Sequence, residues 1–238
     1  MKLKHITFTG IDGQTDIERL KAIQKAYPIA EFGILTSYHW YENGNRYLDP
    51  RMFHRLTKGG HLNLSLHLCG LVAHDVTIDW SNLHYLSWGQ YRWFRRIQLN
   101  VANRKDNPEI VFSSSPWGNE VILQQKDIDH LDMFYETQNS WPSWCPGKLS
   151  VLLDASGGQG IDTDIKVLPN AGKVFKVGYA GGINPDNVEG KLTYLLEHPL
   201  VGDFWIDMES GVRTDDWFDL DKVERILQIC QRIIDNHK

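Results

Sequence analysis

Short apolar runs of strand length alternate with helix-patterned segments along the whole chain. Eight of these runs are predicted to be strands: Leu3–Thr9, Ala30–Thr36, Leu62–Leu68, Phe94–Asn100, Glu120–Gln125, Leu149–Asp154, Val174–Ala180 and Asp203–Met208. The connections between them are long enough to hold helices, and parallel neighbouring strands require long crossovers of this kind. The alternation therefore predicts a parallel sheet with helices packed outside it.

The predicted helices lie between these strands: Asp16–Ala26, Pro50–Leu56, Leu71–Asp79, Ile128–Glu136, Thr163–Leu168, Pro185–Glu197 and Leu220–Asn236. The last has the clearest pattern, because apolar residues recur through it at three- and four-residue spacing. Asp219 is expected to cap its start, and Asn184 with Pro185 to begin the helix before it. Asp16 fits the start of the first helix, where an acid complements the helix dipole.

Eight strand–helix units can close into a barrel or form an open, doubly wound sheet. The count of eight favours closure, as do glycine-rich turns that cluster after the last three strands. An open nucleotide-binding sheet normally has its glycine fingerprint in the first strand-to-helix turn, which here contains only Gly10 and Gly13. We therefore expect an α/β protein, a single (β/α)8 TIM-barrel domain over residues 1–238.

Composition narrows the range of partners. A formal charge of −5 and a pI near 6.0 leave no basic footprint for nucleic acid or an anionic membrane. No run approaches the ~20 apolar residues of a membrane span, and the N-terminus lacks the apolar run of a signal peptide. Cys69, Cys145 and Cys230 form no CxxC pair and suit a reducing cytoplasm. We expect a cytoplasmic protein with a small-molecule ligand, and either a monomer or a homodimer fits the sequence.

Two glycine-containing turns follow the last two predicted strands. The first holds Gly181 and Gly182, and the second reads Glu209-Ser210-Gly211. Without Cβ atoms, glycines let backbone N–H groups approach an anion closely. Either turn alone is best interpreted as an ordinary tight turn. In closed barrels, however, the loops after strands seven and eight frequently form a phosphate site, so the pair predicts an anion site.

These motifs resemble the phosphoribosylanthranilate isomerase family. Residues 178–188 are similar to its seventh strand and turn, in which an aliphatic strand runs into Gly-Gly-(apolar)-Asn-Pro-x-Asn-Val. Residues 207–212 are similar to its last strand, which reads Asp, two variable residues and Ser-Gly-Val. Less specific matches keep the family's order along the chain: Leu152-Leu153-Asp154 followed by the glycine-rich stretch 157–160, Arg46-Tyr47 followed by Pro50, and Gln98-Leu99-Asn100.

The resemblance implies a substrate phosphate bound by Gly181, Gly182, Ser210 and Gly211. It also implies that Asp154 is the general acid and that Arg46 receives the anthranilate carboxylate. The family's first strand ends in a Lys-(apolar)-Cys-Gly motif whose cysteine is the general base, and Thr9 stands at that position here. A threonine hydroxyl is too weak an acid to replace that thiol at neutral pH without an activating partner. The departure concerns the reaction rather than the type of ligand.

Other groups near the predicted barrel mouth are candidates for the missing base. Asp12 follows the first strand and is the strongest of them, and His67 is the alternative, although a histidine there is equally a hydrogen-bonded core residue. Cys69 offers a relocated thiol or a buried small hydrophobe. Substrate contacts are predicted for Arg46, Thr9, Asn100 and Glu209. Glu209 is expected to hydrogen-bond a ligand hydroxyl or to pair with Arg213.

We therefore expect an isomerase-like enzyme that acts on a small phosphorylated metabolite through acid–base proton transfer at a sugar carbon: an isomerase, an epimerase or a lyase. Asp154 would be one partner, with Asp12 or His67 as the other, and no cofactor is expected. One alternative is a catalytically inactive barrel that binds a phosphorylated ligand as a sensor or sequestering protein. The other is a metal-dependent enzyme using His67, Asp154 and Asp207, but no metal-binding spacing occurs, so no metal is expected.

Overall fold

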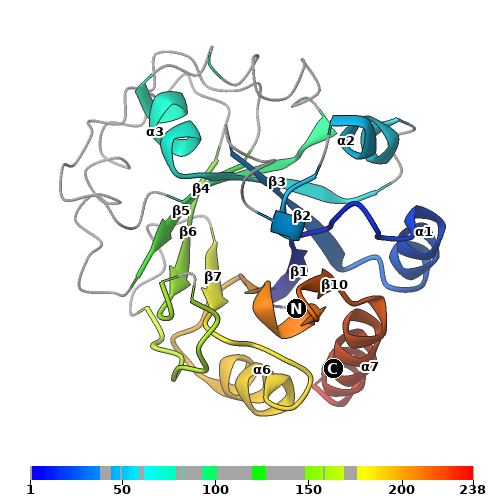
Figure 1. The fold of residues 1–238 in the computed structure, drawn as a ribbon. Coiled ribbons are helices and arrows are strands. Elements are labelled where there is room, and N and C mark those ends of the chain that lie inside the picture. The colour runs from blue at the N-terminus through cyan, green and yellow to red at the C-terminus, as the bar shows by residue number, and fades with distance from the viewer. Residues whose placement is uncertain are drawn as a thin grey trace.

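The computed structural model describes residues 2–37, 44–48, 50–58, 62–78, 82, 93–100, 120–126, 148–157, 159–168 and 176–237. Eight parallel strands close into a barrel in chain order, with β1 pairing to β8. The strands are β1 (Leu3–Thr9), β2 (Ala30–Thr36), β3 (Leu64–Cys69), β4 (Arg96–Asn100), β5 (Glu120–Gln125), β6 (Lys148–Asp154), β7 (Val177–Ala180) and β8 (Phe204–Met208). Figure 1 looks into this ring and shows the helices outside it. The predicted α/β barrel is confirmed.

The described helices connect these strands. They are α1 (Ile17–Ala26), α2 (Pro50–Thr57), α3 (Leu71–Ile78), α6 (Val188–Glu197) and α7 (Leu220–Asn236), with short 3-10 turns η2 (Gly44–Arg46) and η7 (Ser210–Val212). Asp16 caps α1 and Asp219 caps α7, each accepting two backbone N–H groups through its carboxylate, as predicted. The apolar stripe of α7 is buried where this helix packs against α1 and α6 (Figure 1). None of the helices in the described ranges combines the length and apolar character of a membrane span.

One helix prediction is wrong, and one helix begins later than predicted. Residues 163–168 form no helix, and burial there alternates from one residue to the next, which is the pattern of an extended chain rather than a helix. The helix predicted at 185–197 is present as α6 and begins at Val188, after a turn at 185–187. The carbonyl of Asn184 accepts the N–H of Val188 at 3.0 Å, so Asn184 leads the chain into the helix as expected. That turn is closed by Asn184, whose side chain accepts the N–H groups of residues 186 and 187. The predicted helix 128–136 lies outside the described residues.

A hairpin follows the last barrel strand. Its strands, β9 (Arg213–Thr214) and β10 (Trp217–Phe218), pair antiparallel across a turn of two aspartates. Asp215 and Asp216 both have positive φ, at 50° and 61°, a conformation that aspartate adopts more readily than most residues. The hairpin turns the chain back toward the first two strand-to-helix connections, where it contacts η2.

The amino-terminal half of the barrel interior holds a buried ion network. The Arg96 guanidinium lies 2.6 Å from Glu31 and 3.5 Å from Glu120, and the Lys176 ammonium lies 2.6 Å from Glu120. Two carboxylates are thus balanced by two cations inside the barrel. Burial and the neighbouring cations lower the pKa of the adjacent His5 to about 3, so that imidazole adds no charge. Lys176 is a structural residue of this network and does not line the cavity at the barrel mouth.

An apolar layer separates this network from the mouth. Every second residue of β5 points into the barrel. Glu120 belongs to the ion network, Ile122 to the apolar layer above it and Gln124 to the mouth. Ile122 packs with Leu152 and Trp205 in a small cluster that is separate from the main core between strands and helices. The polar residues beyond this layer line the carboxyl ends of the strands, where the barrel opens.

Candidate functional site

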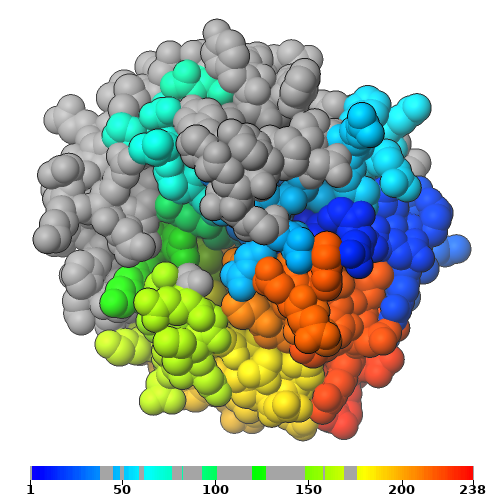
Figure 2. All heavy atoms as spheres, viewed as in Figure 1, coloured from blue at the N-terminus to red at the C-terminus, as the bar shows by residue number. Residues whose placement is uncertain are grey.

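A cavity of about 550 Å³ lies at the carboxyl ends of the barrel strands. Six strands contribute their last residues to its lining: Thr9, Cys69, Asn100, Asp154, Ala180 and Met208. Ten of the eleven predicted site residues also line it: Asp154, His67, Gly181, Gly182, Ser210, Gly211, Arg46, Thr9, Asn100 and Glu209. On the face drawn in Figure 2, the orange segment that contains Ser210 adjoins the light blue segment that contains Arg46. Segments that are far apart in the sequence are therefore brought to one cavity.

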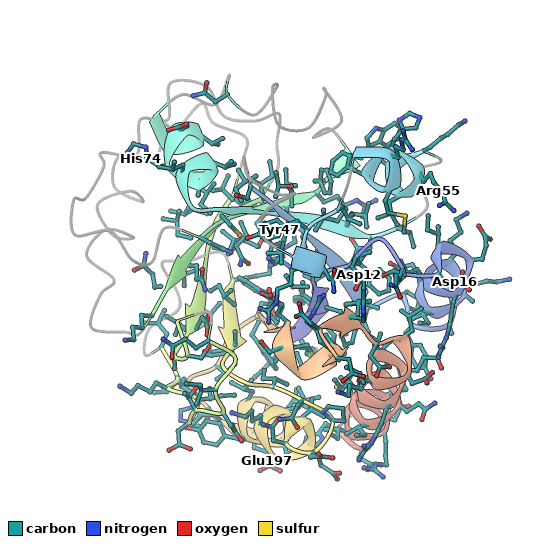
Figure 3. All side chains as sticks on the ribbon, in the orientation of Figure 1. Asp12, Asp16, Tyr47, Arg55, His74 and Glu197 are labelled. Carbon is teal, nitrogen blue, oxygen red and sulfur yellow. The ribbon has the colours of Figure 1, made fainter. Side chains whose placement is uncertain are left out.

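Asp12 is the exception, because it does not line the cavity. Its side chain is fully buried and accepts hydrogen bonds from Thr15, from the Phe218 amide and from Arg213. In Figure 3 Asp12 lies toward α1, whereas Tyr47 lies nearer the middle of the strand ring. The structure thus corrects the placement of Asp12 as a replacement base: its carboxylate fastens the hairpin of β9 and β10 to the first strand-to-helix connection.

The two glycine turns bring free amides to the cavity. Gly181 and Gly182 have φ values of 120° and 62°, which few other residues adopt. No described residue accepts the backbone N–H of Gly181, Gly182, Ser210 or Gly211. A Cβ on Gly182 would overlap the backbone of Ile161 and Asp162, so the absence of a side chain also lets the chain after β6 lie against this turn. Clustered unpaired amides at a cavity wall form an anion-binding surface.

Asp154 is held by donors on each of its carboxylate oxygens. Oδ1 accepts the backbone N–H and the hydroxyl of Ser156, at 3.1 and 2.7 Å, and Oδ2 accepts the amide of Gln124 at 2.8 Å. The residue is only 5% exposed and ends β6 at the cavity wall. Donors of this kind fix the orientation of the carboxylate. Gln124 and Ser156 both line the cavity and had no role in the sequence-based prediction.

Asp207 is a second buried carboxyl at the cavity, and its acid–base character was missed by the sequence reasoning. Thr9 donates its hydroxyl to Oδ1 at 2.8 Å, and Oδ2 has no partner among the described residues. Burial raises the pKa of Asp207 to about 8, and the charges of Glu31 and Asp154 add to that rise. Asp207 therefore carries a proton at neutral pH. Residue type alone gives no signal of this, because the shift arises from neighbours on other strands.

The other two candidate proton carriers, His67 and Cys69, are uncharged at neutral pH. Burial lowers the pKa of His67 to about 4, and its Nε2 lies 3.0 Å from the Ser65 hydroxyl, so the ring is a neutral, hydrogen-bonded residue. Burial likewise raises the pKa of Cys69 to about 12, which keeps it a thiol. Asn100 donates to the Cys69 sulfur at 3.3 Å. These residues shape the wall of the cavity, and the raised pKa of Cys69 disfavours a relocated thiolate base there.

Arg46 and Glu209 form an ion pair at the rim. Arg46 Nη1 donates to Glu209 Oε1 at 3.0 Å, and Arg46 Nε donates to Asp216 at 3.1 Å. The expected pairing of Glu209 with Arg213 is therefore replaced by pairing with Arg46. Arg213 instead donates to the Gly10 carbonyl at 2.7 Å. Burial raises the pKa of Glu209 and the charge of Arg46 opposes that rise.

Within the described ranges, no three His, Cys, Asp or Glu side chains are grouped so that they could hold a metal ion. The combination considered for a metal, His67, Asp154 and Asp207, does line one cavity. Its members have other partners, however, since His67 contacts Ser65 and Asp154 accepts from Ser156 and Gln124.

Substitution of Asp207 by asparagine should change the pH dependence of stability. The raised pKa of Asp207 means that the folded state binds a proton that the unfolded state releases at a pKa near 3.9. Folding stability of the native chain is therefore expected to fall as pH rises from about 4 to about 8, and then to level off. Asp207→Asn should remove this part of the decline, which urea unfolding at a series of pH values would measure. Parallel pH profiles for the two proteins would contradict the assignment.

Comparison with known proteins agrees with the barrel fold. The family model of N-(5′-phosphoribosyl)anthranilate isomerases matches residues 136–229, which is less than half of the chain. No curated protein matches the chain in sequence. The isomerase from Pyrococcus furiosus is 16% identical, with a TM-score of 0.54 over 96% of this chain and 98% of that chain. The one from Thermus thermophilus is 16% identical, with a TM-score of 0.56 over 96% of this chain and 99% of that chain.

A different barrel enzyme is also similar in fold. The phospho-2-dehydro-3-deoxyheptonate aldolase from Thermotoga maritima is 11% identical, with a TM-score of 0.55 over 98% of this chain and 69% of that chain. At identities this low, the structural likeness establishes the fold alone. The family match covers the segment that contains both glycine turns and Asp207. The chain thus resembles the phosphoribosylanthranilate isomerase family, in sequence over its C-terminal part and in fold over nearly its whole length.

Proposed function

We propose that the chain is an enzyme that transfers protons at a sugar carbon of a small phosphorylated metabolite, as an isomerase, epimerase or lyase. One observation carries the proposal: a single cavity is lined both by the free amides of two glycine turns and by two buried carboxyl groups, Asp154 and Asp207, held in different environments. An anion-binding wall beside an acid–base pair is what such a reaction requires.

The phosphate would bind at the glycine turns. Backbone N–H groups of Gly181, Gly182, Ser210 and Gly211 have no acceptor among the described residues, and the Ser210 hydroxyl lies beside them as a further donor. Amides fixed by the backbone lose little freedom when they bind an anion, so they hold a substrate in register. The charged phosphate would therefore supply most of the binding free energy and leave the sugar carbons near the carboxyl groups.

Asp154 and Asp207 would share the proton transfers. The donors around Asp154 suit a carboxylate that accepts a proton, and the raised pKa of Asp207 supplies a carboxyl group that donates one. In an isomerisation, Asp154 removes a proton from the carbon beside the carbonyl while Asp207 protonates the carbonyl oxygen, giving an enediol. Asp154 then gives its proton to the former carbonyl carbon, while the ionised Asp207 takes the proton of the neighbouring enediol hydroxyl. This forms the isomeric carbonyl compound and restores both carboxyl groups. Thr9 would position Asp207 through its hydrogen bond rather than act as a base.

A catalytically inactive barrel that binds a phosphorylated ligand is the second candidate. Thr9 favours it, because a hydroxyl stands where the resembling family has its thiol. Both candidates require the same phosphate site, and they differ only in whether the carboxyl pair turns over a bound ligand.

A ligand-binding panel tests the shared claim. We expect inorganic phosphate and phosphosugars, but not unphosphorylated sugars, to raise the melting temperature of the protein, because a ligand that binds only the folded state stabilises it. Gly182→Asp should abolish the shift through like charge and through overlap with the backbone of residues 161 and 162. Gly190→Asp is the matched control, because nothing lies within 4 Å of a Cβ added there in α6.

Ser210→Ala keeps the turn and removes one donor, so it should weaken phosphosugar binding roughly tenfold without a change in fold. If phosphorylated and unphosphorylated ligands shift the melting temperature equally, or if Gly182→Asp binds phosphate normally, the phosphate site has been misplaced.

A further inference from the structure

We propose that Glu209 makes this cavity select a phosphorylated substrate whose other end donates hydrogen bonds, through hydroxyl or amino groups, and carries no carboxylate. This inference rests on the proposed phosphate site and adds the class of substrate. It starts from the Arg46–Glu209 ion pair at the rim of the cavity, directly beside the turn that would bind the phosphate.

Arg46 is the single cationic side chain in the described lining of the cavity. Three acidic residues line the same cavity: Asp154, Glu209 and Asp207, the last of which carries a proton at neutral pH because its pKa is raised to about 8. His67 adds no positive charge, because its ring is buried and hydrogen-bonded to Ser65. The non-phosphate part of the cavity is thus an environment that repels an anionic group and favours donors.

The guanidinium of Arg46 is already occupied. An arginine binds a carboxylate best through two parallel N–H groups, either Nε with Nη2 or Nη1 with Nη2. Asp216 accepts from Nε at 3.1 Å and Glu209 accepts from Nη1 at 3.0 Å, so each of these two edges has one donor in use. A substrate carboxylate could bind here through two parallel hydrogen bonds only by displacing a carboxylate of the protein.

Glu209 is also fixed by its place in the chain. It directly precedes Ser210, whose amide has no acceptor in the part of the chain that the structure describes, so a bound phosphate would lie close to its side chain. Two anions are tolerated side by side only when a cation neutralises one of them, and Arg46 does this for Glu209. The free Glu209 oxygen would then accept a hydrogen bond from a hydroxyl or amino group of the substrate.

The test compares two five-carbon sugar phosphates, one that begins with a hydroxymethyl group beside a carbonyl and one that begins with a carboxylate beside a hydroxyl. Ribulose 5-phosphate and 5-phosphoribonate would be titrated by calorimetry into the native protein, Glu209→Gln and Asp216→Asn. The native protein is expected to bind ribulose 5-phosphate at least about tenfold more tightly than 5-phosphoribonate. Glu209→Gln removes the anion and keeps the side-chain size, and its neutral amide holds Arg46 less tightly than a carboxylate does, so the preference should fall at least about tenfold or reverse.

Asp216→Asn is the matched variant, because it removes the other anion from Arg46 but does not line the cavity, and it should keep the preference. Equal binding of the two phosphosugars by the native protein overturns the role of Glu209 and leaves the phosphate site intact. An unchanged preference in Glu209→Gln also overturns it. Failure of both phosphosugars and of inorganic phosphate to bind would overturn the proposed function, and the Glu209 proposal with it.

Discussion

Asp154→Asn is expected to lower the turnover of a phosphosugar substrate by at least about a hundredfold and to leave its affinity within a few-fold, because it removes proton transfer but not the phosphate contacts. The substitution should not disturb the fold. The asparagine oxygen can still accept from Ser156, and the amide of Gln124 can turn to present its oxygen to the new NH2 group. The measurement is steady-state turnover together with calorimetric binding of the same phosphosugar.

Asp203→Asn is the matched control for this prediction. Asp203 directly precedes β8, at the opposite end of the strand from the cavity, and its exposed carboxylate pairs with Lys4 at 3.1 Å. Turnover by this variant should equal that of the native protein. Retention of most activity by Asp154→Asn would remove Asp154 from the mechanism, and a parallel loss of binding would show that it holds substrate instead.

Arg96→Met is expected to lower the free energy of unfolding by about 3–5 kcal/mol, because it leaves buried carboxylates without their cation. Glu31 is fully buried and loses the only cation within 4 Å among the described lysines and arginines. Glu120 keeps Lys176, at 2.6 Å, but loses its second partner. Arg96 also lies 4.2 Å from the centre of the Trp205 ring, so its removal loosens the apolar layer under the cavity. Urea unfolding with both proteins at one pH gives the difference.

Arg225→Met is the matched control, because it makes the same change of residue type at the surface of the protein. Arg225 pairs with Asp186 at 3.0 Å, and both side chains are exposed, so its loss should change stability by no more than about 1 kcal/mol. Adding Glu31→Gln to Arg96→Met should recover part of the lost stability by removing the unpaired charge. If Arg96→Met is as stable as Arg225→Met, the interior network contributes nothing to the fold.

The fold could be predicted because barrel strands leave a strong local signal. Each strand is a short apolar run, and the structure has all eight, with bounds that differ by at most three residues from the prediction. Helix caps with a local cause were also predictable, as at Asp16 and Asp219. The segment 163–168 was predicted to be a helix, but its burial follows a period of two, which is the pattern of an extended chain.

The site was predictable where it depends on position along a strand and not where it depends on contacts between strands. Thr9, Asn100 and Asp154 were predicted to lie at the cavity because they end predicted strands, and the glycine turns were recognisable as sequence motifs. The sequence could not exclude Asp12 as a catalytic base, because its partners are distant in the chain. The Phe218 amide, which donates to the Asp12 carboxylate, lies in the hairpin about two hundred residues later. The acid character of Asp207 also depends on burial among side chains from other strands, which no local pattern encodes.

Exchange of substrate hydrogen with solvent tests the central claim most directly, because it reports proton transfer at carbon even when the final product is unknown. The protein would be incubated in D2O with the phosphosugar that binds best, and the hydrogen on the carbon beside the carbonyl would be followed by NMR. We predict that the native protein replaces this hydrogen with deuterium and that Asp154→Asn does so at least about a hundredfold more slowly. If a phosphosugar binds tightly at the glycine turns and keeps all its carbon-bound hydrogen, the proposal of an enzyme is contradicted and the chain is a binding protein.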